Sequence, residues 1–384
     1  MGGRLLVDDR LFAAAVAAAN LPGAIGLILD RHGIRYARGF GVSEIGRDVP
    51  MRIETPVQIA SMTKAIVAVG AMQLVERGKL SLDDPVDQLL PELATPQVLT
   101  GFAGDGSPKL RPAARPITLR HLLTHTSGLS YSFIRPETLR WFQIQGMPPP
   151  GSRKSIEMPL LFDPGEAWEY SVGIDWAGLA IEAATGQRLG AYLAEHVTGP
   201  LRMHDTAFHT APPPGAASVH VPAQEGGWAT QPLWLNSGEF DMGGGGLTST
   251  ALDYGRFLRM VLCGGELDGA RILSGPTLAE MGRNQIGDIR AGYMGTAIPE
   301  LAQPFDSYPD QQTGWGLTWL INPEPTAEGR SAGSLAWAGI FNSYYWADPA
   351  AGIAGVFVSQ VSPFGHPAAL DAFQALERFA YGRD

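Results

Sequence analysis

Ser61 and Lys64 stand three residues apart in the run Ser-Met-Thr-Lys, and an apolar stretch follows them to Val75. Residues three apart on a helix share one face, and a stretch that is apolar on every side predicts a buried helix. Lys64 would then lie at the dry end of a packed element, where an unpartnered ammonium is unfavourable. It should either lose its proton or hold it beside an anionic or hydroxyl neighbour, and both states would activate the Ser61 hydroxyl.

The alternative is a chance spacing with a solvated lysine. Four lysines and 20 serines in 384 residues would place a lysine three positions after a serine about 0.2 times at random. The first turn of the predicted helix also offers unpaired N–H groups and the positive end of the helix dipole, which favour the negative charge that forms when a serine attacks a carbonyl. The pattern therefore favours acyl transfer from an activated serine, without a histidine base.

A second hydroxyl near the lysine would complete a proton path to the leaving group, and Tyr170 is the candidate. It lies in a loop-like segment, residues 164–172, directly before a predicted helix that begins at Ile174. A tyrosine titrates at about 10, so it can act as a base at neutral pH only beside a cation, and Lys64 is a cation that could serve. The alternative is a packed aromatic ring with a satisfied hydroxyl.

Five short motifs span most of the chain. They are Ser-Met-Thr-Lys at 61–64, His-Thr-Ser-Gly-Leu at 125–129, Tyr-Ser-Val at 170–172, Gly-Gly-Gly-Gly-Leu at 243–247 and Trp-Ala-Gly at 337–339. In type and order they resemble the serine β-lactamase and penicillin-binding superfamily, and specifically the class C β-lactamase-like esterases known as family VIII carboxylesterases.

The resemblance implies a role for each matched residue. Ser61 is the nucleophile, Lys64 and Tyr170 form the proton-shuttling pair, and the backbone N–H groups of Ser61 and Ile340 form the oxyanion hole. His125 supports its loop and is not a catalytic base. The mechanism needs no metal and no organic cofactor.

Two positions depart from the lactamase pattern. Val172 stands where lactamases carry an asparagine, and Trp337 begins the motif that is Lys-Thr-Gly in lactamases. Valine cannot donate to a substrate amide, and an indole cannot pair with the carboxylate of a β-lactam. These changes predict a carboxylesterase for short-chain, mostly neutral esters; the alternatives are a β-lactamase or amide hydrolase, an acyltransferase, or a binding protein that is acylated once. The predicted substrate-binding residues are Trp337, Gly339, Tyr131, Phe133 and Val172.

A competing nucleophile is Ser331, in the run Gly-Arg-Ser-Ala-Gly, with Asp348 and His366 following in the order of an α/β-hydrolase triad. A nucleophile elbow needs a strand before the serine and a helix after it. Here a proline-containing segment precedes the serine and a strand-like run follows, so the context favours a hairpin loop.

The strand-like runs predict an antiparallel sheet. Residues 24–30 and 34–40 form a predicted hairpin, and residues 316–321, 334–338, 342–346 and 353–358 are separated by breaks too short for crossover helices. A helix is expected at 368–381, and between about 80 and 245 helical stretches alternate with proline-rich loops. We predict a β-lactamase-like α/β (α+β) fold, with a sheet domain of residues 1–80 and 246–384, a mostly helical domain of residues 81–245, and the active site between them.

The composition restricts the partners. A net charge of -10 and the absence of basic runs argue against nucleic acid, and we expect a small-molecule ester as the substrate. The single cysteine, Cys263, excludes an internal disulfide. No apolar stretch has the length of a membrane span or a signal peptide, which predicts a cytoplasmic protein. The sequence does not indicate the oligomeric state.

Overall fold

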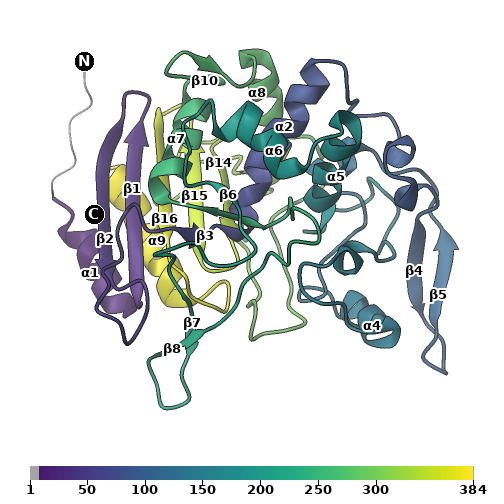
Figure 1. Ribbon diagram of the computed structural model, residues 1–384, viewed down its shortest axis with the longest axis horizontal. Helices are drawn as coiled ribbons and strands as arrows, with labels where there is room; N and C mark the ends of the chain where they lie inside the picture. The colour runs from purple at the N-terminus through teal and green to yellow at the C-terminus, as the bar shows by residue number, and fades with distance from the viewer. Residues whose placement is uncertain (1–7, 384) are drawn as a thin grey trace.

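The two ends of the chain meet in one antiparallel sheet, in a computed structural model that describes residues 8–383 (Figure 1). Strand β1 pairs on one side with β2 and on the other with β16, so that Ile25 lies opposite Val358. The sheet has the order β12-β13-β14-β15-β16-β1-β2. Its strands are β1 (Gly23–Asp30), β2 (Ile34–Gly41), β12 (Gly314–Trp315), β13 (Leu320–Ile321), β14 (Leu335–Gly339), β15 (Ser343–Asp348) and β16 (Ile353–Val358).

Helices cover both faces of this sheet. A Cβ added at Gly26 of β1 would touch Phe12 of α1 (Arg10–Ala19) and Leu376 of α9 (Pro367–Ala380). The next residue, Leu27, instead contacts Gly255 of α7 (Ala251–Leu262). Because successive side chains of a strand point to opposite faces, α1 and α9 lie on one side and α7 on the other. This double cover explains why every residue of β1 is buried.

Helix α2 (Thr63–Glu76) is the predicted buried helix, with every residue from Thr63 to Leu74 buried. It packs against α5 (Gly173–Thr185) and α6 (Leu189–Leu193), which continues as a π-helical turn, Ala194–Thr198. The other helices are α3 (Leu119–Leu123), α4 (Pro136–Gln145) and α8 (Gly275–Met281), and short 3₁₀ turns lie at Ala60–Met62, Val86–Gln88, Pro91–Leu93 and Arg153–Ile156.

The remaining strands form small sheets. A three-stranded sheet joins β3 (Val57–Gln58), β9 (Leu247–Ser249) and β6 (Ala207–Phe208), and three hairpins pair β4 (Gln97–Phe102) with β5 (Pro108–Pro112), β7 (Val219–Pro222) with β8 (Trp228–Gln231), and β10 (Glu266–Leu267) with β11 (Ala270–Arg271). The β4–β5 hairpin reaches out from the helical side of the molecule (Figure 1).

The sequence predicted the fold class, the β1–β2 hairpin, three of the four C-terminal strands and the last helix, and these predictions are confirmed. The run at 316–321 was predicted as one strand, which is wrong, because only its last two residues pair, as β13. Gly316 donates to the Trp319 carbonyl, and Thr318 has a φ of 110°, so the preceding residues form a turn. The division at residues 80 and 245 stays a prediction.

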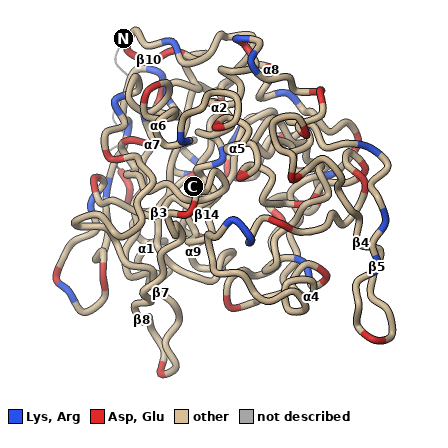
Figure 2. Tube along the Cα trace, turned by 45° about the vertical axis from the view of Figure 1, so that its right-hand side comes forward, with Lys and Arg blue, Asp and Glu red and all other residues tan. Residues whose placement is uncertain are grey.

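Positively and negatively charged residues are interspersed along the trace (Figure 2). Within residues 8–383, no helix is long and apolar enough to cross a membrane. The same residues contain no cluster of three or more histidine, cysteine, aspartate or glutamate side chains arranged to hold a metal ion.

Candidate active site

Ser61 lies in a tight turn that is fixed on both sides. The turn is 3₁₀ (Ala60–Met62), and Ala60 has a φ of 46°. A left-handed backbone is uncommon outside glycine and is often found at functional sites. Two bonds hold this segment from neighbouring elements: Leu247 N donates to Thr63 Oγ1 at 3.2 Å, and the Tyr254 hydroxyl donates to the Met62 carbonyl at 3.0 Å.

Lys64 lies one turn further along and is 1% exposed. Its Nζ lies 3.0 Å from Ser61 Oγ and 3.0 Å from the Tyr131 hydroxyl, and it also bonds to the Gly244 carbonyl. An ammonium has three N–H donors, and these three oxygens can accept all of them. A neutral amine would instead offer its lone pair to the Ser61 hydroxyl proton. The structure therefore brings the predicted nucleophile and its lysine into direct contact.

Tyr131 was predicted only as a pocket wall, and its hydroxyl contact with Lys64 was not foreseen. Burial raises the pKa of the Tyr131 hydroxyl well above its usual range, and the charge of Asp175 raises it further. Tyr131 therefore stays a neutral phenol that can both donate and accept. No pattern in the sequence indicates the direction of this hydroxyl.

Tyr170 lies against Lys64 through its ring. Lys64 Nζ is 4.8 Å from the Tyr170 ring centroid, a cation–π distance, while the Tyr170 hydroxyl accepts a bond from Trp337 Nε1 at 2.9 Å. Within the described part of the chain, the hydroxyl forms no hydrogen bond to Ser61 or Lys64. The structure thus brings Tyr170 to the site and pairs its hydroxyl with the indole of β14.

His125 holds the Tyr170 segment. Its Nδ1 lies 3.0 Å from Ser171 Oγ and accepts the Ser171 backbone N–H at 3.2 Å, which places the ring proton on Nε2. Burial lowers the pKa of His125 well below its usual value, and the charge of Lys64 adds to this effect, so the ring is neutral. This geometry agrees with a supporting role for His125.

A narrow cavity of about 30 Å³ opens at Ser61. None of the lining residues carries a formal charge; they are Ser61, Phe133, Ile134, Tyr170, Met294, Gly295, Ala302, Gln303, Trp337, Ala338, Gly339, Ile340 and Phe364. Of the predicted substrate-binding residues, Phe133, Trp337 and Gly339 line the cavity. Tyr131 and Val172 do not line it, and Val172 is a buried residue at the start of α5.

The end of β14 lies against the serine turn. A Cβ at Gly339 would stand 2.5 Å from the Ile59 carbonyl oxygen, so only glycine allows this approach. The close contact brings Ile340, the residue after the strand, to the same cavity as Ser61. The two residues named for the oxyanion hole therefore line the same cavity, and their role stays a prediction.

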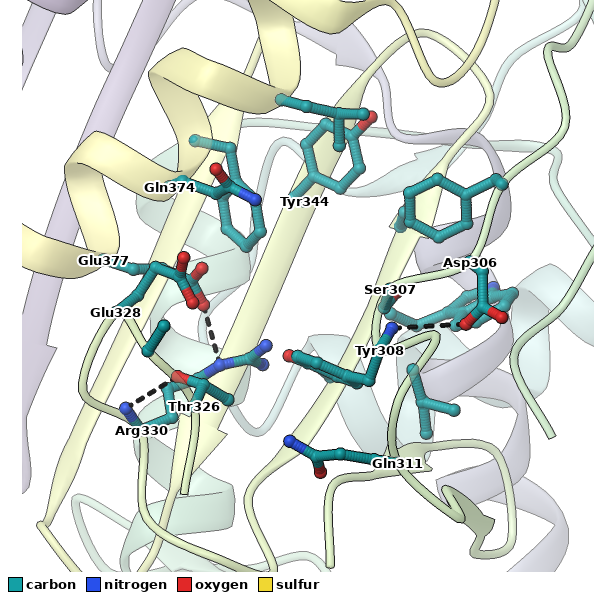
Figure 3. A pocket seen from close by; sticks show the side chains of 18 of the residues that line it. Asp306, Ser307, Tyr308, Gln311, Thr326, Glu328, Arg330, Tyr344, Gln374 and Glu377 are labelled. Atoms are coloured by element: carbon teal, nitrogen blue, oxygen red, sulfur yellow. Dashed lines mark hydrogen bonds and ion pairs between the residues drawn. The ribbon is translucent and has the colours of Figure 1, made fainter. Parts of the chain in front are cut away.

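A larger cavity, of about 410 Å³, shares the lining residues Trp337 and Ala338 with the first but is not lined by Ser61 (Figure 3). It contains a buried ion pair, in which Arg330 Nε is 2.7 Å from Glu377 Oε1. Figure 3 shows the guanidinium between Glu377 and Tyr308. Burial raises the pKa of Glu377 to about 7, against the opposing charge of Arg330.

Ser331 lies beside this ion pair, in the loop between β13 and β14, and not on a strand-to-helix elbow. Its backbone N–H donates to Asp348 Oδ2 at 2.7 Å. His366 lies against the Trp228 ring, with centroids 5.2 Å apart. The structure therefore shows none of the contacts of a triad at Ser331.

Known proteins resemble this chain over most of its length. Residues 9–379 match the family model described as Beta-lactamase. Monacolin J acid methylbutanoyltransferase of Aspergillus terreus is 32% identical over 99% of this chain and 96% of its own length, and the lovastatin esterase of Penicillium rubens is 31% identical over 91% of each. The solved structure of an Aspergillus terreus simvastatin synthase mutant has a TM-score of 0.82 and 31% identity, covering 97% of this chain and 95% of that one. The chain belongs to the beta-lactamase family and is an enzyme of the serine hydrolase type.

Proposed function

We propose that this protein is an acyltransferase that carries a short, uncharged acyl group on Ser61 and delivers it to an organic alcohol. The observation that carries the proposal is the contact of Ser61 Oγ with the Nζ of buried Lys64 at 3.0 Å, beside a cavity with no charged lining residue. The earlier prediction of a simple esterase uses the same residues and becomes the second candidate.

In the first half-reaction, Lys64 accepts the Ser61 proton as Oγ attacks the carbonyl carbon of an activated acyl donor. The backbone N–H groups of Ser61 and Ile340 bind the oxyanion, and removal of one such donor typically costs about 10²–10³ in rate. The proton passes through Tyr170 to the leaving group as its bond to the acyl carbon breaks. The products are the acyl-serine and the protonated leaving group.

In the second half-reaction, an acceptor hydroxyl attacks the acyl-serine, and Ser61 regains its proton. The cavity lining contains no carboxylate and no histidine that could activate a water molecule separately. Water and an alcohol would therefore depend on the same lysine and tyrosine. The mostly apolar lining can bind the carbon skeleton of an alcohol, but it provides few hydrogen-bond partners for water. This difference favours acyl transfer over hydrolysis.

Hydrolysis is the second candidate because one relative is named a lovastatin esterase, while another is named a methylbutanoyltransferase. Membership of the family VIII carboxylesterases stays a prediction. The uncharged lining also argues against a β-lactam, whose carboxylate would need a cation at the position of Trp337. We expect slower turnover of a chromogenic cephalosporin than of p-nitrophenyl butyrate.

The test supplies p-nitrophenyl esters of rising chain length with and without an added primary alcohol. Mass spectrometry then measures the ratio of new ester to free acid. A transferase should form mainly the new ester and prefer short acyl chains, whereas free acid as the main product at all alcohol concentrations would support the esterase. Ser61→Ala should abolish acylation, and Ser331→Ala is the matched control that should keep it; the opposite pattern would contradict the assignment of the nucleophile.

A further inference from the structure

Asp175 is a buried acid directly behind the catalytic lysine. It lies in the first turn of α5, is 1% exposed, and accepts the backbone N–H of Gly244 on its Oδ1 at 2.8 Å. The carbonyl of the same glycine accepts a hydrogen bond from Lys64 Nζ. One residue of backbone therefore connects the carboxylate to the lysine.

The fit between Asp175 and the glycine loop is close. A Cβ at Gly244 would stand 2.2 Å from Asp175 Oδ2, and a Cβ at Gly243 would stand 2.7 Å from the Ile174 carbonyl oxygen. The first half of the four-glycine run is thus pressed onto the start of α5. Any side chain at Gly244 would push the carboxylate away or move the carbonyl that Lys64 binds.

Three other titratable side chains surround Lys64. Tyr131 and Tyr170 face the lysine from the segments after α3 and before α5, and the neutral ring of His125 lies close enough to feel its charge. Burial raises the pKa of Asp175 above its ordinary value, and the charge of Lys64 and the Gly244 N–H oppose this rise only in part. Within residues 8–383, Lys64 forms no salt bridge with any carboxylate. Asp175 is instead connected to it through the backbone of Gly244, which binds both side chains.

We propose that Asp175 is a positioning residue for Lys64, holding the Gly244 carbonyl against the amine and supplying the negative charge that balances the ammonium. The inference rests on the proposed acylation of Ser61. A carboxylate this close stabilises the positive charge of the Lys64 ammonium. Its removal should move the onset of activity to lower pH.

The test is Asp175→Asn, which keeps the shape and an oxygen that can accept the Gly244 N–H but removes the charge. The ascending limb of log kcat/KM against pH, measured with p-nitrophenyl butyrate, should move down by about one pH unit. The rate of Ser61 labelling by a fluorophosphonate should show the same displacement. Asp253→Asn is the matched control, since Asp253 is also a buried acid in a first helical turn, bonded to Thr206 and the Asp205 N–H.

An ascending limb that stays in place in Asp175→Asn would overturn the proposal, even if the plateau rate fell, because a purely structural role lowers the rate at all pH values. Asp175→Ser, a smaller neutral variant, should show the same displacement and serves if the asparagine variant does not fold. Failure of the wild-type protein to label at Ser61 at any pH would contradict the proposed function itself. Normal wild-type labelling with an unmoved limb would contradict only the role of Asp175.

Discussion

The two tyrosines at Lys64 should respond differently to loss of their hydroxyl groups. In Tyr131→Phe, Lys64 loses one of its three acceptors, and a hydrogen bond to a charged group contributes about 1.5–3 kcal/mol. If that whole contribution acted on the transition state, kcat/KM would fall about 10- to 150-fold, since about 1.4 kcal/mol corresponds to a factor of ten. In Tyr170→Phe, the proposed proton carrier is lost, and such groups contribute about 10²–10⁴ in rate.

The assay compares both variants with the wild type, using p-nitrophenyl butyrate under single-turnover conditions so that acylation is observed directly. Acyl donors with more basic leaving groups make the difference between the two variants larger, because departure of such a leaving group depends more strongly on its protonation. Tyr170→Phe should lose more rate as the leaving group becomes more basic, and Tyr131→Phe should lose a constant factor. A steeper dependence in Tyr131→Phe would refute our assignment and make Tyr131 the proton carrier.

Two further predictions concern the walls of the site and the core. Gly339→Ala should reduce acylation about 10²–10³-fold, because the new methyl group would meet the Ile59 carbonyl at 2.5 Å and displace an oxyanion donor; unchanged acylation would contradict this geometry. Arg330→Met should lower the free energy of unfolding by about 3–5 kcal/mol, since it leaves Glu377 buried without its partner. In the wild-type protein, the folded-state pKa of Glu377 is about 7, above its ordinary value of 4.5. The stability that protonation of Glu377 provides is therefore present below about pH 4.5 and is lost as pH rises through 7. Thermal unfolding of Arg330→Met should therefore show a larger loss of stability at pH 9 than at pH 5. The control is Arg378→Met, at a partly exposed arginine, which should change stability little.

The sequence was sufficient for features that depend on local geometry. The spacing of Ser61 and Lys64 needs only one turn of a buried helix, and the apolar run to Val75 predicted that helix. The runs of apolar residues at β1 and β16 likewise predicted these strands, because the pattern of a strand lies within its own sequence. The β4–β5 hairpin was missed because all of β5 is at least partly exposed and carries no alternating pattern.

Contacts across the fold could not be predicted in the same way. The direction of the Tyr131 hydroxyl depends on how the loop after α3 packs on α2, and the pairing of Tyr170 with Trp337 joins residues 167 positions apart. Asp175 did leave a signal, as a lone acid among the buried apolar residues of Ile174 to Ile181. Such an acid needs a partner, although the sequence does not say which.

The place of Asp175 is also consistent with the proposed use of Lys64 as a base. A carboxylate in direct contact would hold the ammonium proton too firmly, because Coulomb attraction grows as the separation falls. With no counter-charge, burial would make the ammonium so unstable that the amine could not take up the Ser61 proton. A carboxylate on the far side of the Gly244 peptide gives an intermediate attraction, and the uncharged cavity lining leaves that attraction undisturbed. In the proposed mechanism, the four-glycine loop is the spacer between Asp175 and Lys64.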